Sequence, residues 1–448
     1  MRKVINFLSK NFSFRRENIR KLVLLLVIIF ISISNYTFAA PVEITYASLP
    51  GPDYMEAARR IIPAFEKAYP DIKVKKLDIS APYWQKIQTM IAGNTAPDIF
   101  WVSTGLFAQF GEAGTLLDIR KYIVTMRKEF DFDDFWPKVL DSYTYKGKLY
   151  GLPKETNMMM MFYNKKLFRE AGVPYPSINP DRPWVWEKEF LSAAKKLTKD
   201  YNGDGKIDQF GCSANTAWWV VYPILWSAGG DIFNKDITKC IIDSPEAIRA
   251  LQWYADLRLK YNVSPTPVQA EAFGVVGADY DMMAQGKIAI VFNNSIPIYP
   301  LRKYKDVDWD VAPFPAWEGK LRERVNLCSG GGFTVSATTQ HSEEAFKFLA
   351  FLTGKESAAV WASLLGWVPT RKSIARSSDF LVPNQPPANL KFVLKEASRI
   401  RAIPSTPKWS ETVYNILNPS LDDLWLGEKS AQELLPDIAR RINELLKK

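Results

Sequence analysis

The residues from Asp200 to Asp208 have the oxygen-bearing side chains and the spacing that a calcium-binding loop needs. Asp200, Asn202, Asp204 and Asp208 stand at positions 1, 3, 5 and 9 of such a loop, a glycine stands at position 6, and Lys206 offers its backbone carbonyl at position 7. A hard cation needs several oxygens that converge on one point, and this spacing wraps them around it. The pattern therefore predicts a structural Ca²⁺ site.

The same loop departs from the calcium-binding pattern at position 12. Gly211 stands where a bidentate glutamate is expected, which weakens the expected affinity and argues against a switching role. The alternative interpretation is a solvated turn of Asp, Asn and Gly residues that joins a helix to a strand.

The chain is poor in the side chains that most catalytic mechanisms use. It has one histidine, His341, just before a helix start at Ser342, and none of its three cysteines has a Cys-x-x-Cys spacing. Neither of the glycine-rich phosphate-binding motifs occurs. These absences disfavour histidine-, zinc- and nucleotide-dependent chemistry. Glycoside hydrolysis by two carboxylates stays open, because it needs only Asp and Glu.

Tryptophans are the most informative aromatic residues, and all 15 lie beyond residue 40. Trp253 and Trp361 fall in helical patterns typical of core residues. Several others lie at strand ends, in loops or in a run: Trp101, Trp218, Trp219, Trp317, Trp367 and Trp409. A sugar site needs flat rings for the C–H faces of the ligand and short polar groups for its hydroxyls. Burial explains any one of these tryptophans, but the set predicts that two or three stack on a sugar.

A run of glycines precedes a predicted strand at Ser329–Phe333. Glycine lets a backbone approach a ligand closely, and it also permits unusual φ angles. Both interpretations stay open, whereas an anion site is disfavoured because no adjacent lysine or helix start supports it.

The first forty residues are typical of a secretory signal peptide. Seven basic residues flank or precede a 12-residue apolar run, Leu22–Ile33, and small residues end the segment at Ala39-Ala40. The run is too short to span a hydrocarbon core of ~30 Å as a helix. No cysteine at the cleavage site offers a lipid attachment point. We therefore expect cleavage near Ala40 and a free protein in a periplasm or extracellular space.

Removing the signal peptide also removes most of the positive charge. The full chain has 58 basic and 48 acidic residues, and residues 41–448 have 51 and 47, a net charge of +4. This balance gives no reason to expect a nucleic-acid partner. Cys212, Cys240 and Cys328 are few for an exported chain. They allow one disulfide, Cys212–Cys240, or none.

The remaining chain alternates between strand and helix patterns. Val42–Tyr46 reads as a strand, Tyr54–Tyr69 as a helix, and Ile72 begins a second strand. This order is typical of an α/β fold with parallel strands. Ser244 and Ser430 are N-caps of further amphipathic helices. About 408 residues exceed what one core supports, so we expect two domains, with residues 380–387 forming a surface loop rich in Pro, Asn and Gln.

Short motifs along the whole exported chain resemble the extracellular solute-binding proteins of ABC-type sugar importers, of the maltodextrin-binding kind. The motifs are Tyr83–Lys86 with Gly93–Asp98, Gly147–Pro153, Tyr163–Lys165 with Ala171–Val173, Trp186-Glu187, Gly286–Ala289, Val311–Pro315, Gly331-Gly332 and Gly366–Pro369. Each motif is weak alone, whereas their order and spacing together are specific.

The resemblance implies a two-lobed periplasmic-binding-protein fold, in which each lobe is a mostly parallel sheet flanked by helices. Its N-terminal lobe would comprise residues 41–149 and 293–338, and its C-terminal lobe residues 150–292 and 339–448. Hinge crossings would fall near Tyr150–Leu152, Ile290–Asn294 and Thr339, and the lobes would close on a ligand held between them.

The resemblance also implies a ligand site and partners. By match to the family pattern, the ligand-binding residues would be Asp53, Trp101, Ser103, Glu155, Trp218, Trp219, Asn293, Gly331, Gly332 and Trp367. The expected partners are a carbohydrate and the permease subunits of an ABC importer, and the protein would be a monomer and not an enzyme. An exported glycoside hydrolase or lyase, and a binder of a peptide, polyamine or metal complex, are the alternatives.

Overall fold

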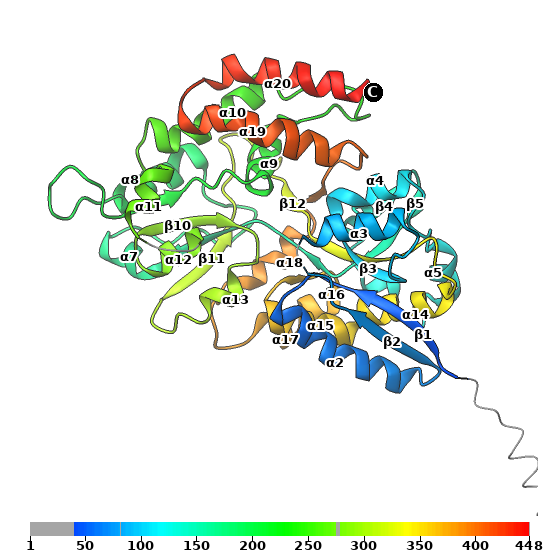
Figure 1. The fold of residues 1–448 in the computed structure, drawn as a ribbon. Coiled ribbons are helices and arrows are strands. Elements are labelled where there is room, and N and C mark those ends of the chain that lie inside the picture. Colours follow the sequence, from blue (N-terminus) through cyan, green and yellow to red (C-terminus); the bar gives the residue numbers. More distant parts are fainter. Residues whose placement is uncertain (1–39, 81, 275–277, 448) are drawn as a thin grey trace, which may run out of the picture.

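The computed structural model describes residues 40–80, 82–274 and 278–447. The predicted signal peptide, residues 1–40, lies outside these residues except for Ala40. Two separate β-sheets, each flanked by helices, form the centres of two lobes (Figure 1). The predicted α/β class with two lobes is confirmed. No helix among the described residues has the length and hydropathy to cross a membrane.

The sheet of the first lobe has five strands, some paired in parallel and some antiparallel. Their order is β2 (Ile72–Leu77), β1 (Val42–Ala47), β3 (Ile99–Ser103), β13 (Gly331–Val335) and β6 (Gly151–Pro153). β1 pairs in parallel with β2 and β3, whereas β13 pairs antiparallel with β3 and β6. The sheet is therefore mixed rather than mostly parallel.

Helices from both ends of the chain cover the first sheet. They are α2 (Pro52–Ala68), α3 (Tyr83–Ala92), α4 (Phe107–Glu112), α5 (Arg120–Met126), α6 (Pro137–Asp141), α14 (Ser342–Leu352), α15 (Lys355–Leu365), α16 (Lys372–Ala375), α17 (Ser378–Leu381) and α18 (Val393–Glu396), with short turns η1 (Thr104–Leu106), η2 (Phe132–Asp134) and η4 (Leu390–Phe392). Phe348 of α14 packs edge-on against Tyr46 of β1, with ring centroids 5.4 Å apart. This aromatic contact joins the late helices to the first core.

The second sheet has four strands and is buried on both faces. Their order is β11 (Trp309–Pro313), β8 (Met160–Asn164), β10 (Ile288–Asn293) and β9 (Phe210–Ser213). β10 is parallel to β9 and antiparallel to β8, which in turn is antiparallel to β11. Along β8, Met160 and Phe162 join the core that continues from the first lobe, whereas Met161 and Tyr163 join a second core. This period of two is that of a strand between two apolar layers.

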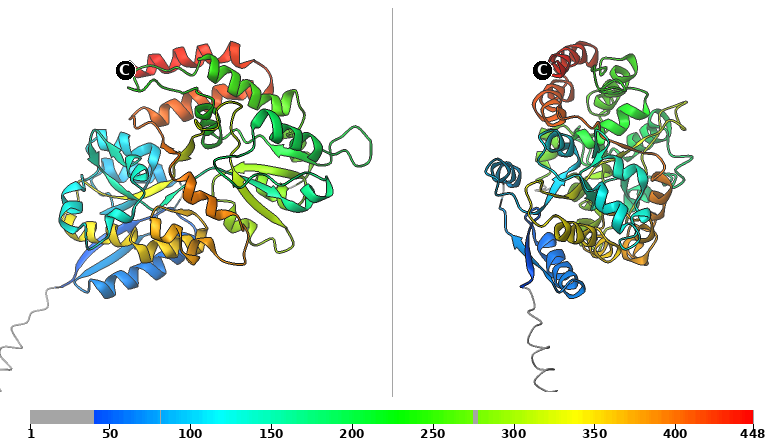
Figure 2. Two further views of the ribbon diagram at one scale, coloured as in Figure 1. Left: turned by 180° about the vertical axis from the view of Figure 1, so that it is seen from behind. Right: turned by 90° about the vertical axis from the view of Figure 1, so that its right-hand side faces the viewer.

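The helices of the second lobe are α7 (Lys165–Glu170), η3 (Trp186–Phe190), α8 (Leu191–Leu197), α9 (Trp218–Ser227), α10 (Pro245–Leu259), α11 (Pro267–Ala272), α12 (Asp279–Ala284), α13 (Ile298–Leu301), η5 (Glu411–Leu417), α19 (Asn418–Leu426) and α20 (Ala431–Leu446). The predicted caps are present, because Ser244 accepts from the N–H of Ala247, and Ser430 and Glu433 form a reciprocal capping box. α10, α19 and α20 lie side by side at the end of the second lobe (Figure 2).

The sheets and cores divide the chain differently from the predicted partition, which we correct here. β6 belongs to the first sheet although it was assigned to the C-terminal lobe, and β11 belongs to the second sheet although it lies within 293–338. α14 and α15, predicted in the C-terminal lobe, pack in the first core. The reason is that strand pairing and aromatic packing join segments far apart in sequence, which local patterns do not encode.

The chain crosses between the lobes at three places, all of which carry short strands. β7 (Glu155–Thr156) follows β6, β12 (Asn326–Cys328) precedes β13, and β15 (Ile400–Ala402) precedes the last helices. β12 pairs in parallel with β15, and Asn157 bridges Ser329. Smaller pairs are β14 (Val368–Pro369) with β7 and β4 (Thr144–Tyr145) with β5 (Lys148–Leu149). The crossings predicted near Ile290–Asn294 and Thr339 are therefore wrong.

A buried polar network joins the three crossings. The side chain of Asn326 accepts from the N–H of Met159 at 2.8 Å and donates to the carbonyl of Met159 at 3.1 Å. It also donates to Glu396 at 2.9 Å, and Glu396 accepts from Arg324 at 2.8 Å. The side chains of Arg324 and Glu396 are 1% and 0% exposed, and Arg399 adds a longer ion pair to Glu396 at 4.0 Å. The buried charges depend on these partners and on neighbouring dipoles for compensation.

We predict that Glu396→Gln lowers the free energy of unfolding by ~3 kcal/mol, because it leaves the buried guanidinium of Arg324 without a counter-charge. Urea unfolding at neutral pH measures the change. The control is Asp423→Asn, which removes the more exposed ion pair with Lys429 and should cost ~0.5 kcal/mol or less. Equal losses for the two variants would contradict the structural role of the network.

Candidate functional site

A lysine that solvent does not reach lies among three aromatic rings where the chain leaves β6. Nζ of Lys154 lies 4.3 Å from the ring centroid of Tyr54, 4.9 Å from that of Trp361 and 3.8 Å from that of Trp367. It donates to the Tyr54 hydroxyl at 2.8 Å and lies 3.0 Å from Oε2 of Glu155. Because a cation is attracted to aromatic faces, this arrangement holds the partly exposed ring of Trp367 in one orientation.

Burial shifts the titration of both charged members of this cluster. It lowers the pKa of Lys154 to about 8, although the charge of Glu155 opposes the shift. It raises the pKa of Glu155, and Lys154 and the N–H of Gly331 oppose that shift. Each group is therefore held in its charged form mainly by the other, and removing one would leave a buried charge without a partner.

The glycine run brings the β13 backbone against Glu155 and Trp101. The N–H of Gly331 donates to Oε1 of Glu155 at 2.9 Å. A Cβ on Gly331 would lie 2.0 Å from Cζ2 of Trp101, and one on Gly332 would lie 2.4 Å from the carbonyl oxygen of Leu152. The close approach predicted for this run is thus an approach of protein to protein. Ligand contact by Gly331 and Gly332 stays a prediction.

The second lobe presents a polar cluster around Asp279, the first residue of α12. Asp279 accepts from the hydroxyl of Ser213 at 3.3 Å and from the amides of Asn215 and Asn293 at 3.2 and 3.5 Å. Ser213 and Asn293 end β9 and β10, which are parallel, so the cluster lies at carboxyl strand ends, where α/β proteins bind ligands. Burial raises the pKa of Asp279 to about 6 in spite of these donors.

Two tryptophans begin α9 close to the same lobe boundary. Trp218 is 9% exposed and Trp219 is partly exposed, with their ring centroids 5.7 Å apart. Trp218 also packs edge-on against Trp409 at 5.6 Å. Among the described residues, Nε1 of Trp219 has no hydrogen-bond partner. A flat ring with an unpaired N–H suits a ligand with both C–H faces and hydroxyls.

Contacts on two sides bring the clusters of the two lobes to a common boundary. A Cβ on Gly105, just after β3, would lie 2.5 Å from Cδ1 of Trp409, which packs against Trp218. A Cβ on Gly366, next to Trp367, would lie 2.9 Å from Cγ2 of Ile298, a residue on the segment that leaves β10. The first contact joins the β3 end to the α9 tryptophans, and the second joins the Trp367 end to the Asn293 end.

The remaining predicted ligand residues lie next to these clusters. Asp53 is partly exposed in the first turn of α2, beside Tyr54, and Ser103 is partly exposed at the end of β3, opposite Gly331 in the ladder. Trp101 is 9% exposed, and its Nε1 has no hydrogen-bond partner within the described part of the chain. The structure thus gathers the first-lobe residues, while their contact with a ligand stays a prediction.

Sequence reasoning missed four residues of these clusters and misjudged two others. Tyr54, Lys154, Asn215 and Asp279 were not selected, and only the position of Lys154 next to the selected Glu155 was a usable signal. Trp317 and Trp409, considered as stacking rings, are 0% and 1% exposed. Trp317 donates to a backbone carbonyl within the second core at 2.9 Å and is a core residue.

The predicted calcium-binding loop is an exposed segment whose side chains bond to their own backbone. Asp200 accepts from two backbone N–H groups, at 2.7 and 2.9 Å, and Asn202, Asp204 and Asp208 each accept one more, that to Asp204 coming from Lys206. Among the residues the structure describes, no group of three or more His, Cys, Asp or Glu side chains is arranged to hold a metal ion. Calcium binding therefore stays a prediction.

The three cysteines are buried and none forms a disulfide. Of the two predicted alternatives, the structure has the one without a bridge. Cys212 lies on β9 and Cys240 follows a loop, and burial raises the pKa of both thiols. Thiols with raised pKa values are poor nucleophiles, so they give no reason to expect thiol chemistry.

Comparison with known proteins identifies the family. The model of the family described as bacterial extracellular solute-binding protein matches residues 50–359. Since the match covers more than half of the chain, this protein belongs to that family. Its members bind solutes outside the cell, and the predicted resemblance is confirmed.

Individual relatives and structures are similar over most of the chain. A putative binding protein of Brucella abortus is 27% identical over 409 residues, 90% of this chain and 92% of the relative. The arabinooligosaccharide-binding protein of Bacillus subtilis is 28% identical over 340 residues, 72% of each chain. The ABC substrate-binding protein of Listeria monocytogenes in complex with cycloalternan is 28% identical, with a TM-score of 0.77, and covers 91% of this chain and 99% of that one.

We predict that Asp279→Asn changes the pH dependence of stability. The folded-state pKa of about 6 exceeds the ordinary aspartate value of 3.8, so ionisation disfavours the folded state. This penalty is absent below pH ~4, grows between pH ~4 and ~6, levels off above that, and amounts to ~2 kcal/mol at pH 7 after allowance for partial exposure. Urea unfolding at several pH values should show the variant gaining stability relative to the wild type between pH 4 and 7. A constant difference would mean that Asp279 titrates normally.

We predict that Ca²⁺ stabilises the protein through the 200–208 loop. At a few millimolar Ca²⁺, a weak site should add ~1 kcal/mol, or roughly 1–2 °C in Tm, measured by calorimetry against a sample with chelator. The double variant Asp200→Asn and Asp204→Asn should show no Ca²⁺-dependent shift. If wild type and variant respond alike, the loop is only a solvated turn.

Proposed function

We propose that this protein captures a carbohydrate between its two lobes and delivers it unchanged to the permease of an ABC-type importer. The ligand would contact the aromatic cluster around Lys154 in the first lobe and the cluster around Asp279 and Trp219 in the second. Closure of the lobes would then stabilise the bound state by the contacts that only the closed arrangement makes.

The observation that carries this proposal is a set of buried polar atoms at the lobe boundary. In the described part of the chain, Nε1 of Trp101, Nε1 of Trp219 and Oδ1 of Asn157 have no hydrogen-bond partner. Two are donors and one is an acceptor. Buried polar groups are nearly always paired, and a polyol supplies hydroxyls that both donate and accept. A carbohydrate therefore matches both kinds of atom with one chemical group.

The aromatic rings support the same ligand class. Trp84 lies 5.2 Å from Trp101, and Tyr54 lies 6.1 Å from Trp367, measured between ring centroids. Trp84 and Trp367 are partly exposed, so each has a face that a ligand can reach. Sugar rings present C–H groups to such faces while their hydroxyls meet the polar rim.

The relatives support a sugar rather than another solute. The Bacillus subtilis relative is named for arabinooligosaccharide, and the Listeria monocytogenes structure contains cycloalternan. Both ligands are oligosaccharides, and both proteins are close to 30% identical to this chain. The proposed ligand is therefore a neutral mono- or oligosaccharide. The ion pair of Lys154 and Glu155 would be a fixed part of the site rather than a counter-charge for the ligand.

Location and assembly belong to the proposal as well. The basic residues, the apolar run Leu22–Ile33 and the small residues at Ala39-Ala40 support export and cleavage, and the absence of a cysteine there supports a form without a lipid. We infer a monomer that serves the importer from the periplasm or the cell exterior. A nucleic-acid partner is no part of the proposal.

Catalysis is no part of it either. A hydrolase of the two-carboxylate kind needs an acid and a base directed at the substrate. Glu155 accepts from the N–H of Gly331 and pairs with Lys154, and Asp279 accepts from three side-chain donors. Both carboxylates are thus directed at protein groups, which suits binding better than proton transfer.

We predict that Trp219→Ala weakens sugar binding about tenfold, a loss of ~1.4 kcal/mol, because it removes a stacking ring and its free N–H. The measurement is a titration of intrinsic fluorescence with arabino- and maltooligosaccharides, in which the wild type should respond saturably. The matched control is Trp184→Ala, since Trp184 is also partly buried but stacks on Phe168, 6.1 Å away, at the periphery of the second core.

The control variant should bind as the wild type does.

Mass spectrometry of the recovered ligand should show the sugar intact. If shortened sugars or unsaturated elimination products increase with time and with protein concentration, the hydrolase or lyase alternative is correct and the binding proposal is wrong. A panel of sugars without any saturable response would point to the non-sugar alternative.

A further inference from the structure

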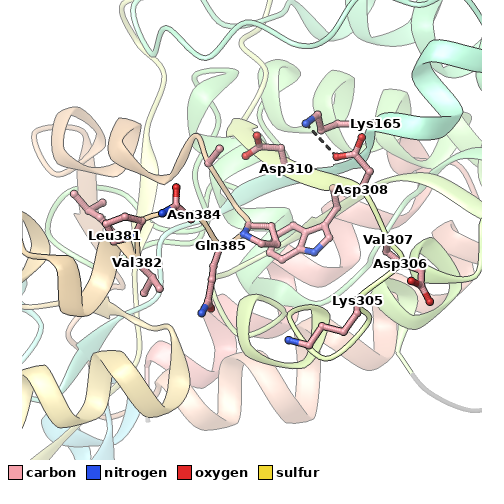
Figure 3. A pocket seen from close by; sticks show the side chains of 14 residues that line it. Lys165, Lys305, Asp306, Val307, Asp308, Asp310, Leu381, Val382, Asn384 and Gln385 are labelled. Carbon is pink, nitrogen blue, oxygen red and sulfur yellow. Dashed lines mark ion pairs between the residues drawn. The ribbon is translucent and has the colours of Figure 1, made fainter.

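A pocket that is separate from the aromatic clusters lies between β11 and the segment that links α17 to η4. It has a volume of about 620 Å³. One wall consists of Lys165 and residues 305–310, and the other of residues 381–386 with Ala388. Figure 3 shows Asp308, Asp310 and Lys165 gathered on one side of the pocket and Asn384 and Gln385 on the other. The walls come from different lobes.

Asp310 is the most unusual residue of this pocket, because it is 4% exposed and has no counter-ion. Its Oδ1 accepts from the backbone N–H groups of Val311 and Asn389, at 2.9 and 3.0 Å. Its Oδ2 accepts no hydrogen bond from the described residues, and Asp310 forms no ion pair with them. Burial raises the pKa of Asp310 in spite of the two backbone donors. A buried carboxylate with one unused oxygen beside a pocket is a place for a hydrogen-bond donor.

The other charges of the pocket are already compensated or exposed. Asp308 pairs with Lys165 at 3.1 Å and with Arg169 on its outer side. Lys305 and Asp306 are adjacent, exposed and of opposite sign. Asp310 is thus the lining carboxylate that forms no direct ion pair with the described residues, although the charge of Lys165 partly offsets the effect of burial on its pKa. A positive ligand can pair with it directly, whereas an anion or a neutral molecule cannot.

The opposite wall offers neutral acceptors. Asn384 and Gln385 are exposed side-chain amides, whose carbonyl oxygens can share the hydrogens of an ammonium group. Trp309, also a lining residue, is 2% exposed, and its Nε1 has no partner among the residues described. Trp309 lies on the same wall as Asp310, and because an indole N–H only donates, it is not a partner for an ammonium group.

We propose that this pocket binds a small organic cation with a primary ammonium group. The ammonium donates to Oδ2 of Asp310, and the side chains of Asn384 and Gln385 accept its remaining hydrogens. The site is independent of the proposed carbohydrate function, since none of its lining residues belongs to the aromatic clusters or to the Asp279 cluster.

An occupant of this pocket connects the two lobes. Asp310 belongs to β11 of the second sheet, and Asn384 and Gln385 follow α17, which packs against α15 on the first sheet. The linking segment is already attached to the second lobe, because Arg302 donates to the carbonyl of Pro386 at 2.8 Å and Asn389 donates to Asp310. A bound cation therefore adds to the contact between the linking segment and the second lobe. Since lobe movement either preserves or breaks this contact, the cation would shift the equilibrium between lobe arrangements.

The test uses 1,4-diaminobutane as the probe and 1,4-butanediol as the neutral analogue of equal length, with isothermal titration calorimetry of the sugar-free protein at low ionic strength. The wild type should bind the diamine saturably and the diol at least tenfold more weakly. Asp310→Asn keeps an oxygen for the N–H groups of Val311 and Asn389 but removes the charge, and should weaken the diamine at least tenfold. The matched control, Asp236→Asn, removes an exposed charge elsewhere in the second lobe and should bind the diamine as the wild type does.

The proposal is overturned if the wild type shows no saturable diamine binding, if the diol binds as tightly, or if Asp310→Asn binds the diamine as Asp236→Asn does. Should Asp310→Asn fail to fold, Gln385→Ala decides, because this side chain is exposed and forms no hydrogen bond with the described residues. It should weaken the diamine about threefold, and an unchanged affinity overturns the proposal. Sugar titrations of the same variants report on the carbohydrate site separately, so that either proposal can fail alone.

Discussion

The arrangement of the two lobes depends on the buried hydrogen bonds of Asn326. Asn326 lies on the second crossing. Its side chain bonds to the N–H and the carbonyl of Met159 on the first crossing, and it donates to Glu396 just before the third. A buried polar network stabilises one arrangement only when all of its members are satisfied, because an unpaired buried group costs about 1–3 kcal/mol. Because the crossings connect the lobes, the way they are held limits which residues of different lobes can meet, such as Gly105 and Trp409.

The first crossing also carries part of the candidate binding site, which ties ligand recognition to lobe geometry. Lys154 and Glu155 lie directly between β6 of the first sheet and β8 of the second. Glu155 bonds to β13, and Lys154 lies under the ring of Trp367. A ligand that contacts these residues acts on the segment about which the lobes move. It can favour closure only by contacts that differ between the open and closed states, and the unpaired atoms of Trp219 in the second lobe are candidates for such contacts.

The sequence predicted local structure well and lobe membership poorly, for one physical reason. The caps at Ser244 and Ser430 and the helix at Tyr83–Ala92 depend on neighbouring residues, and all are present. Residues 310–312 and 333–337 have strand patterns in the sequence, but which sheet each joins depends on partners about 150 to 230 residues away. In the same way Glu155 and Trp367 were recognised by their motifs, whereas the aromatic surroundings of Lys154 arise only when α2, α15 and the β6 end come together.

Asp279, Lys154 and Asp310 share a property with a few other buried charged residues of this protein, among them Glu155 and Arg371. Burial moves the pKa of each toward the neutral form, so each charge destabilises the folded protein unless something compensates it. Surface pairs such as that of Asp423 with Lys429 have no such cost, since water solvates both partners. Lys154 is compensated by Glu155 and by aromatic rings, whereas Asp279 has neutral donors and Asp310 has backbone N–H groups and the more distant charge of Lys165. An uncharged side chain of the same shape would be more stable at Asp279 and at Asp310. That the protein keeps carboxylates there points to ligands that supply the missing partners.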